Sequence, residues 1–464
     1  MNWNAVLPEL ILSLGILTVF ILELFLEKKH YKFLSVLAFI FVVLAGYSVF
    51  FVKYPASVFF GGFSVDLLTL IGKLFILAVT GLVLLSSYDY FSKKDSVYGE
   101  LPYLYLIATL GLMVMLSSDN LAIIFTGLEL ASITMYILVG LFRREYLSKE
   151  GAFKYLVIGT TGTSMYALGS ALVYGSTGSL RLSPVQGENT LFALGVLLII
   201  SALALKVSSV PFHFWTPDAY EGAPTPTTAY LSTVPKIAMY FLFVKLTIGV
   251  FSYFADWKYI VMVLAVLSMF YGNIVAYAQK SVKRLLAYSS IAHAGYFLTA
   301  LTNVDKHMFT ALLFYVFVYA LATLGAFSVL SVLEKKEGWT HHFLDFQGLG
   351  RENPVLALML SFFLFALIGI PPAAIFLGKL GIFFGLMKAK YIFLGILFAI
   401  ASLISAGYYL KVIVYMFLQE GSEKFGKAEV SAGEAFTILI SAFFVIFFGL
   451  YPEVVINYLL RAFS

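Results

Sequence analysis

The chain has 464 residues, of which 61% are hydrophobic and 12% are charged, with a formal net charge of +5 and a mean hydropathy of +0.94. Soluble chains carry about 25% charged residues, so this composition excludes a soluble domain. The lysines are spread along the chain, which argues against a nucleic-acid partner, and the absence of cysteine excludes disulfides and thiolate-bound clusters in this chain.

Apolar stretches of about 20 residues, the length that crosses a bilayer as a helix, recur along the chain. They predict fourteen membrane-spanning helices, at 6–26, 31–52, 65–90, 101–118, 120–142, 152–174, 190–212, 227–250, 257–278, 285–301, 307–333, 355–388, 391–419 and 432–460. Only short polar links separate them, so we expect an all-α multi-pass membrane protein. The first stretch has no basic flank or cleavage site, and we expect it to be retained as a helix.

Two of these stretches contain proline where a continuous helix cannot hold it. Pro211 lies at the end of the seventh stretch and Pro217 shortly after it, and Pro371 and Pro372 lie inside the twelfth. Proline removes a backbone donor and clashes with the preceding turn, so both stretches are predicted to be broken helices.

The positions of the two breaks predict the domain organisation. They lie five stretches apart, which favours two inverted five-helix repeats, each with one broken helix. We therefore expect a three-helix extension (1–100), a first repeat of helices four to eight (101–250), a second repeat of helices nine to thirteen (251–420) and a final helix (421–464).

Loop charges predict the orientation. Links after odd-numbered stretches hold most of the loop lysines and arginines, including Lys28, Lys29, Lys94, Lys335 and Lys424. Positively charged loops stay in the cytoplasm, so both termini are predicted on the non-cytoplasmic side of a bacterial inner membrane.

Several ionisable residues lie inside the apolar stretches, where each costs roughly 2.5–3.5 kcal/mol at the bilayer centre. Glu129 lies near the middle of the fifth stretch. It is either half of a structural ion pair or a carboxylate that carries protons. The lysines inside the stretches are Lys73, Lys154, Lys206, Lys236, Lys245, Lys379 and Lys411.

The positions of these lysines suggest different roles for them. Lys206, Lys236 and Lys379 are the candidates for a proton relay, since burial favours a neutral lysine and a nearby carboxylate favours a charged one. The alternative for each is a lysine that reaches the membrane surface with its charged end. Lys154 is expected either to pair with Glu129 or to anchor the cytoplasmic boundary.

For Lys73, Lys245 and Lys411 we expect the surface-reaching role. His293 lies in the tenth stretch, where it either passes protons between the two halves or is a satisfied buried histidine. His341 and His342 are adjacent in a cytoplasmic link, which is a weak pattern for a metal site.

Three segments resemble one known family. They are "VPFHFWTPDAYEGAPTPTTAYLSTVPKIAMY" (210–240), "VKRLLAYSSIAHAGY" (282–296) and "GIPPAAIFLGKLGIF" (369–383). Together they resemble the antiporter-like membrane subunits of respiratory NADH-quinone oxidoreductase, and the first resembles the subunit N branch in particular. The resemblance covers about 100 to 420 and implies a subunit that couples electron transfer from NADH to quinone with outward proton pumping.

The resemblance also implies residue roles. Glu129 matches the glutamate that pairs with a lysine, and Lys154 matches a lysine of the sixth helix. Lys206 matches the central protonation site on the broken seventh helix and Lys236 the lysine that leads to the second half-channel. His293 matches the tenth-helix histidine. Lys379 matches the lysine of the broken twelfth helix near the exit.

The same resemblance implies the partners. Flavin and iron–sulfur clusters are expected in peripheral NADH-oxidising subunits, with no cofactor in this chain. The other expected partners are sibling antiporter-like subunits and the lipid bilayer. Quinone is expected as the substrate of the complex. A subunit of a multi-chain sodium/proton antiporter is the nearest alternative, and a non-pumping scaffold bundle within a membrane oxidoreductase is a second.

Overall fold

The computed structural model describes residues 3–27, 31–93, 98–182, 189–420 and 426–463. Lys28, Lys29, Lys94 and Lys424, on which the predicted orientation partly rests, lie outside the described residues.

The described chain is helical apart from one short hairpin. In chain order the elements are η1 (Trp3–Val6), α1 (Leu7–Phe25), α2 (Tyr31–Ser48), η3 (Val49–Phe51), β1 (Ala56–Val58), η4 (Phe59–Gly61), β2 (Phe63–Val65), α3 (Leu67–Lys93), α4 (Leu101–Leu116), α5 (Leu121–Val139), α6 (Tyr146–Thr177), α7 (Thr190–Lys206), α8 (Trp215–Gly222), α9 (Thr225–Gly249), η5 (Phe251–Tyr253), α10 (Trp257–Tyr277), α11 (Val282–Thr299), α12 (Lys306–Glu334), η6 (Phe343–Phe346), α13 (Leu349–Glu352), α14 (Pro354–Ile368), α15 (Ala374–Lys388), α16 (Ile392–Leu418), α17 (Ala432–Leu450) and α18 (Glu453–Arg461). β1 pairs with β2 in antiparallel register.

Polar side chains fix several helix starts. Asn120, Asn189 and Ser281 each accept a hydrogen bond from a backbone amide in the first turn of α5, α7 and α11. Ser431 and Glu434 form a reciprocal capping box at the start of α17. Such caps satisfy amides that have no partner within the helix, and they matter most where little water is available.

Ten helices of the described chain are long and apolar enough to cross a membrane, and α4, α7 and α14 are shorter apolar helices. Both predicted interruptions are present. The first separates α7 from α8, and the second separates α14 from α15 across 369–373. The chain is therefore an all-helical multi-pass membrane protein.

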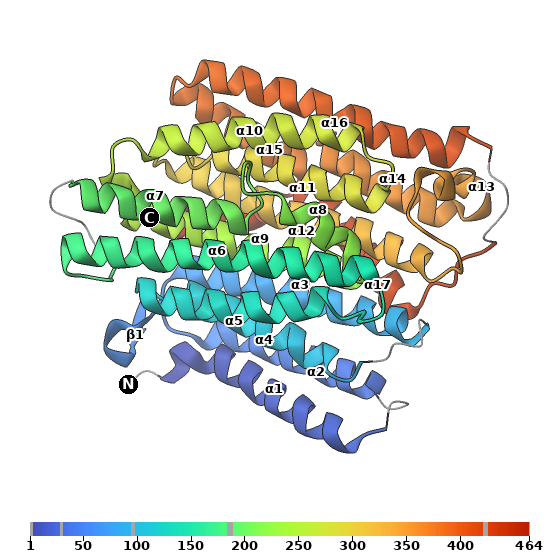
Figure 1. Ribbon diagram of the computed structural model, residues 1–464, viewed down its shortest axis with the longest axis horizontal. Coiled ribbons are helices and arrows are strands. Elements are labelled where there is room, and N and C mark those ends of the chain that lie inside the picture. Colours follow the sequence, from blue (N-terminus) through green and yellow to red (C-terminus); the bar gives the residue numbers. More distant parts are fainter. Residues whose placement is uncertain (1–2, 28–30, 94–97, 183–188, 421–425, 464) are drawn as a thin grey trace.

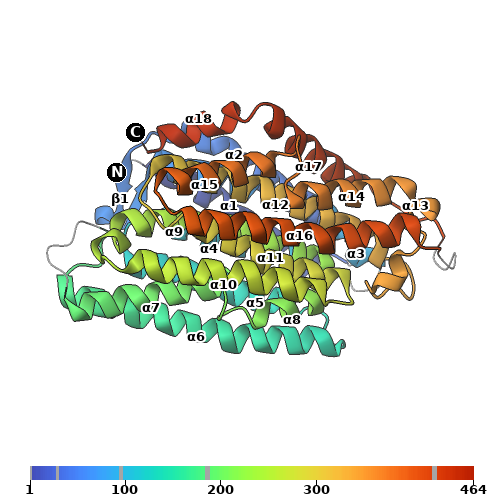
Figure 2. The same ribbon diagram turned by 90° about the horizontal axis from the view of Figure 1, so that it is seen from above.

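The long helices lie side by side, with their axes close to one direction (Figure 1). The start of α1 and the end of α18 lie at the same end of the bundle as β1, and α13 lies at the opposite end (Figure 2). We call these the β1 end and the α13 end.

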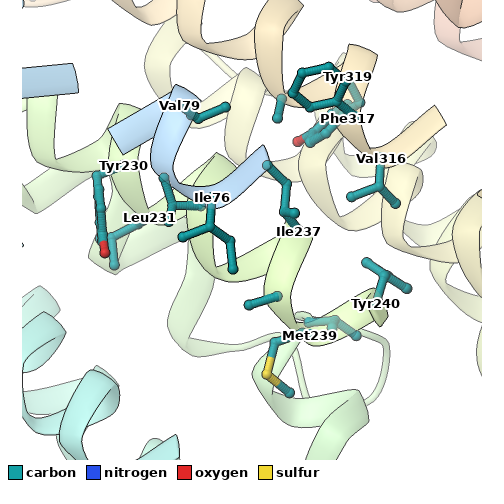
Figure 3. Close-up of a cluster of buried hydrophobic side chains, with 14 of the residues drawn as sticks. Ile76, Val79, Tyr230, Leu231, Ile237, Met239, Tyr240, Val316, Phe317 and Tyr319 are labelled. Atoms are coloured by element: carbon teal, nitrogen blue, oxygen red, sulfur yellow. The ribbon is translucent and has the colours of Figure 1, made fainter. Parts of the chain in front are cut away.

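The helices differ in how far they are enclosed. The most apolar part of α12 is wholly buried and that of α9 is nearly so, whereas less than half of the corresponding part of α1, α2, α16 or α17 is buried. Figure 3 shows Ile76 of α3, Ile237 of α9 and Phe317 of α12 in one apolar cluster. The centre of the bundle is therefore the region around α9 and α12.

Candidate proton relay

The first helix break holds Lys206 at a helix end. Lys206 is the last residue of α7, where the free carbonyls make a cation favourable. The Trp215 indole nitrogen donates to the carbonyl of Leu205 at 3.1 Å, so one freed backbone acceptor is satisfied. Ser208 has a φ of +66°, which lets the chain leave the helix direction within two residues.

Glu129 and Lys206 are connected through a hydroxyl. The Thr163 hydroxyl donates to Oε1 of Glu129 at 2.5 Å, and Nζ of Lys206 lies 3.3 Å from the same hydroxyl oxygen. Nζ also donates to Ser132 at 2.8 Å and to the Tyr136 hydroxyl at 3.4 Å. A proton can therefore pass between the carboxylate and the lysine with one intervening group.

A cavity separates Lys206 from Lys236. Its volume is about 20 Å³, and its walls include both lysines together with Ser132, Tyr220 and Pro235. A single water needs about 10–15 Å³ and two or more polar partners, and this cavity meets both conditions. The two lysines thus line one cavity that is large enough to hold a water.

Lys236 follows a proline inside α9. Pro235 has no amide to donate to the carbonyl of Leu231, and the Tyr220 hydroxyl lies 3.5 Å from that carbonyl oxygen. Nζ of Lys236 donates to the Ser290 hydroxyl at 2.5 Å and to the Ser290 carbonyl at 2.8 Å. Ser290 lies on α11, so this contact crosses from one proposed repeat to the other.

His293 continues the path from Ser290 along α11. Its Nδ1 lies 2.8 Å from the Tyr315 hydroxyl and its Nε2 lies 3.3 Å from the Tyr409 hydroxyl. Tyr409 in turn shares a short hydrogen bond with Ser289. Both ring nitrogens therefore have a hydroxyl partner, which allows the ring to pass a proton by changing tautomer.

Lys379 lies on α15, one turn past the second break. Its Nζ donates to the carbonyl of Ile368, freed at the end of α14, at 2.8 Å and to the Ser402 hydroxyl at 2.9 Å. The ammonium also lies 4.8 Å from the centre of the Tyr296 ring, which makes an edge contact with His293. Each broken helix thus holds a lysine beside its break: Lys206 has hydroxyl partners only, and Lys379 has one backbone carbonyl and one hydroxyl.

Lys154 lies apart from Glu129. Its Nζ is 2.6 Å from Glu150 and 2.6 Å from Asp218, and Arg284 contacts Asp218 and Glu221 at 2.7 Å. Of the two alternatives for Lys154, pairing with Glu129 is therefore not observed. The residue belongs to a charged network at the end of α8 that joins α6 to α11.

Two further buried lysines have carboxylate partners that sequence reasoning missed. Lys73 is fully buried and lies 2.7 Å from Glu9, and Lys245 lies 2.9 Å from Asp119. Burial works against ionisation of Asp119, but the Lys245 ammonium and a hydrogen bond from Ser64 together hold the pKa of that carboxyl below its ordinary value. The expected surface-reaching role of Lys73 and Lys245 is therefore wrong. Glu9, an acidic residue near the start of the first stretch, was the feature of the sequence that could have indicated a partner for Lys73.

His341 and His342 do not converge. His342 caps η6 by accepting from the amide of Leu344, whereas His341 lies against Glu334. Among the described residues, no group of three or more histidine, aspartate and glutamate side chains is arranged to hold a metal ion.

Residues 118–405 match the family model described as NADH:quinone oxidoreductase/Mrp antiporter, transmembrane. The chain belongs to this family.

Individual relatives place it within the family. It is 84% identical over the full length of both chains to "NADH-quinone oxidoreductase subunit N 1" of Aquifex aeolicus. It is 47% identical to "NADH-quinone oxidoreductase subunit N 2" of Hydrogenobaculum, with 99% of each chain covered.

Solved structures agree on the fold. A chain of respiratory complex I from Thermus thermophilus with bound aureothin superimposes with a TM-score of 0.83 at 30% identity, covering 97% of this chain and 98% of that one. A chain of the Mrp complex from Dietzia superimposes with a TM-score of 0.87 at 20% identity, covering 100% and 97%. The similarity to the Dietzia chain, at 20% identity, shows the fold alone. The assignment to the subunit N branch of the family therefore depends on the subunit N relatives.

Proposed function

We propose that Glu129, Lys206, Lys236, His293 and Lys379 form the proton relay of this antiporter-like membrane subunit N of bacterial NADH-quinone oxidoreductase. The observation that carries the proposal is that one hydroxyl and one small cavity connect Glu129, Lys206 and Lys236 inside an apolar bundle. Lys236 then contacts α11, which carries His293, and the Tyr296 ring lies between His293 and Lys379. Polar groups in such surroundings are costly, and a scaffold gains nothing from retaining them in a row.

The relay uses electrostatics. When the Glu129 carboxylate is ionised it favours a protonated Lys206, and when that charge is screened Lys206 releases its proton toward the cavity and Lys236. From Lys236 the proton passes by Ser290 to His293 and on to Lys379, which delivers it outwards. Lys154 stays at the edge of this path, where it holds the Asp218 network in position.

The same proposal includes the finer architecture. Counting α7 with α8, α14 with α15 and α17 with α18 as single spans, and leaving out the four-residue helix α13, gives fourteen spans. We assign residues 1–100 to an extension, 101–250 and 251–420 to two inverted repeats, and 421–464 to a final helix. Close glycine contacts between α4 and α5, and again between α10 and α11, support the repeats because these helix pairs occupy equivalent positions.

The surroundings follow from the subunit N assignment. The α13 end, where Arg284, Lys335 and Lys336 gather, is assigned to the cytoplasm and both termini to the outside of the inner membrane. Sibling membrane subunits pack beside this chain, and peripheral subunits hold the flavin and iron–sulfur clusters and deliver electrons to quinone. This chain contains no cysteine to bind such clusters.

Reconstitution separates this function from the sodium/proton antiporter alternative. The complex, purified in mild detergent through a tag on this chain, is placed in vesicles, and proton movement and quinone reduction are followed. We expect proton movement that starts with NADH and stops with a quinone-site inhibitor. Sodium-dependent proton movement without NADH, from an assembly that lacks redox activity, would instead favour the antiporter.

A further inference from the structure

A second polar cluster lies at the α13 end, outside the relay. Glu334, the last residue of α12, accepts a short hydrogen bond from Thr225, the first residue of α9. His341 Nε2 lies 3.3 Å from the same carboxylate, and the Trp339 indole donates to His341 Nδ1 at 3.3 Å. Since Nδ1 accepts, Nε2 carries the ring hydrogen on the side of the ring that faces Glu334.

The cluster lies at the boundary between water and the interior. The Glu334 side chain is 12% exposed and the His341 side chain 8% exposed, whereas Thr225 is fully buried. The Tyr90 hydroxyl lies beside Glu334 from α3. A carboxylate in this position contacts both the aqueous surface and the start of α9.

One face of α9 leads from this cluster to Lys236. At 100° per residue, Ser232 and Lys236 fall within about 20° of Thr225, and Lys236 lies about 16 Å further along the axis. Thr228 is adjacent to this face, and all four side chains are buried. Hydroxyls therefore follow the face at intervals of one to two turns.

The facing side of α12 carries matching groups. Ser331 lies one turn before Glu334, is buried, and has no hydrogen-bond partner among the described residues. Thr323 lies beside the Tyr319 hydroxyl, and the Tyr319 ring is 5.7 Å from Nζ of Lys236. A buried hydroxyl without a protein partner is normally bonded to water, so this seam between α9 and α12 favours hydration.

We propose that Glu334, held by His341, is a proton inlet that supplies Lys236 along the α9–α12 seam without passing through Lys206. The inference rests on the proposed function. A proton from the α13 end binds the Glu334 carboxylate, crosses the seam through hydroxyls and water, and protonates neutral Lys236, which leaves Glu334 ionised for the next proton.

The test uses the intact complex in vesicles, with NADH-driven proton uptake and uncoupled quinone reduction measured together. Glu334→Gln keeps the size and the acceptor oxygen of the side chain but cannot be ionised, and Glu337→Gln is the matched exposed control. We expect Glu334→Gln to lower proton uptake at least threefold while uncoupled quinone reduction and the Glu337→Gln variant stay near wild type.

Two outcomes decide the inlet. If Glu334→Gln pumps like wild type while Lys236→Ala does not, the inlet is overturned and the relay stands. If Glu334→Gln does not assemble, Thr323→Val and Ser331→Ala interrupt the seam with the carboxylate in place. Reduced uptake in these variants supports the inlet, and wild-type uptake in both overturns it.

Discussion

At the scale of residues, the buried lysines of the relay are held mainly by neutral oxygens. Lys236 and Lys379 contact a backbone carbonyl and a hydroxyl each, and Lys206 contacts hydroxyls. A full carboxylate contact would fix each lysine in its charged form. Hydroxyl and carbonyl partners accept a hydrogen bond from either form, which suits a group that must change its protonation state. Lys73 and Lys245, with direct carboxylate partners, are instead suited to holding helices together.

The Thr163 hydroxyl tests the connection between Glu129 and Lys206. Thr163→Val keeps the shape of the side chain and removes the hydroxyl, so we expect coupled proton uptake to slow about tenfold, or about 1.4 kcal/mol on the barrier. Thr160→Val, which removes an exposed hydroxyl one turn earlier on α6, is the control. Equal rates in the two variants would mean that Thr163 only packs.

Sequence reasoning could name the ionisable residues of the proposed relay but not the groups between them. A charge in an apolar stretch is conspicuous, which is why Glu129, Lys206, Lys236 and Lys379 could be named. Tyr409 and Ser290 are as compatible with ordinary packing as with a relay, and only the fold brings them to His293 and Lys236. The role of Lys154 was uncertain for the same reason, because Asp218 lies far from it in sequence.

At the scale of elements, helix ends and helix contacts set the geometry. Asp305 caps α12 by accepting from the amides of His307 and Met308 at 2.8 and 3.0 Å. Burial works against ionisation, but these amides and Lys388 hold the pKa of Asp305 below its ordinary value. Because the pKa of Asp305 is lower in the folded state, the cap stabilises the folded protein fully at pH values above the pKa of the unfolded state. This stabilisation is lost as the pH falls through the pKa of the folded state.

Amide hydrogen exchange measures how much this cap stabilises the start of α12. Asp305→Ala is expected to speed exchange at His307 and Met308 about fivefold, which corresponds to about 1 kcal/mol. The ratio to wild type should stay constant between pH 7 and pH 5, since the carboxylate remains ionised there. Asp256→Ala, at the start of α10, is the control because Asp256 makes no capping hydrogen bond. A ratio that falls toward one by pH 5 would contradict the lowered pKa.

Glycine allows α10 and α11 to approach closely. A Cβ at Gly272 would lie 2.5 Å from the backbone nitrogen of Ala292, whereas a Cβ at Gly46 on α2 meets nothing within 4 Å. Gly272→Ala is therefore expected to cost about 1–3 kcal/mol, and Gly46→Ala to be neutral or stabilising. Thermal unfolding of the detergent-solubilised complex compares them, and equal midpoints would contradict the close contact.

The elements were more predictable than their boundaries. Every predicted stretch corresponds to a helix or to a helix pair, because hydropathy and proline act locally. The sixth stretch was predicted as 152–174, and α6 extends to Tyr146–Thr177 because its ends are polar but still hydrogen-bonded as helix. Such ends carry no hydropathy contrast with the adjacent loops.

At the scale of the whole molecule, the proposed relay residues extend across the bundle from α5 to α15. α9 and α12 lie beside these residues and are the most buried long helices of the described chain. The Arg284 contacts with Asp218 and Glu221 join α11 to α8 next to this path. We therefore expect burial, rather than any single contact, to keep protons on the proposed relay.

The most direct test of the relay is proton uptake by vesicles that contain the complex with Lys206→Ala. Lys306→Ala, at the exposed start of α12, is the control, and quinone reduction is measured with and without an uncoupler. The relay predicts that Lys206→Ala loses proton uptake attributable to this subunit while Lys306→Ala keeps it. Unchanged proton uptake per NADH oxidised in Lys206→Ala would contradict it.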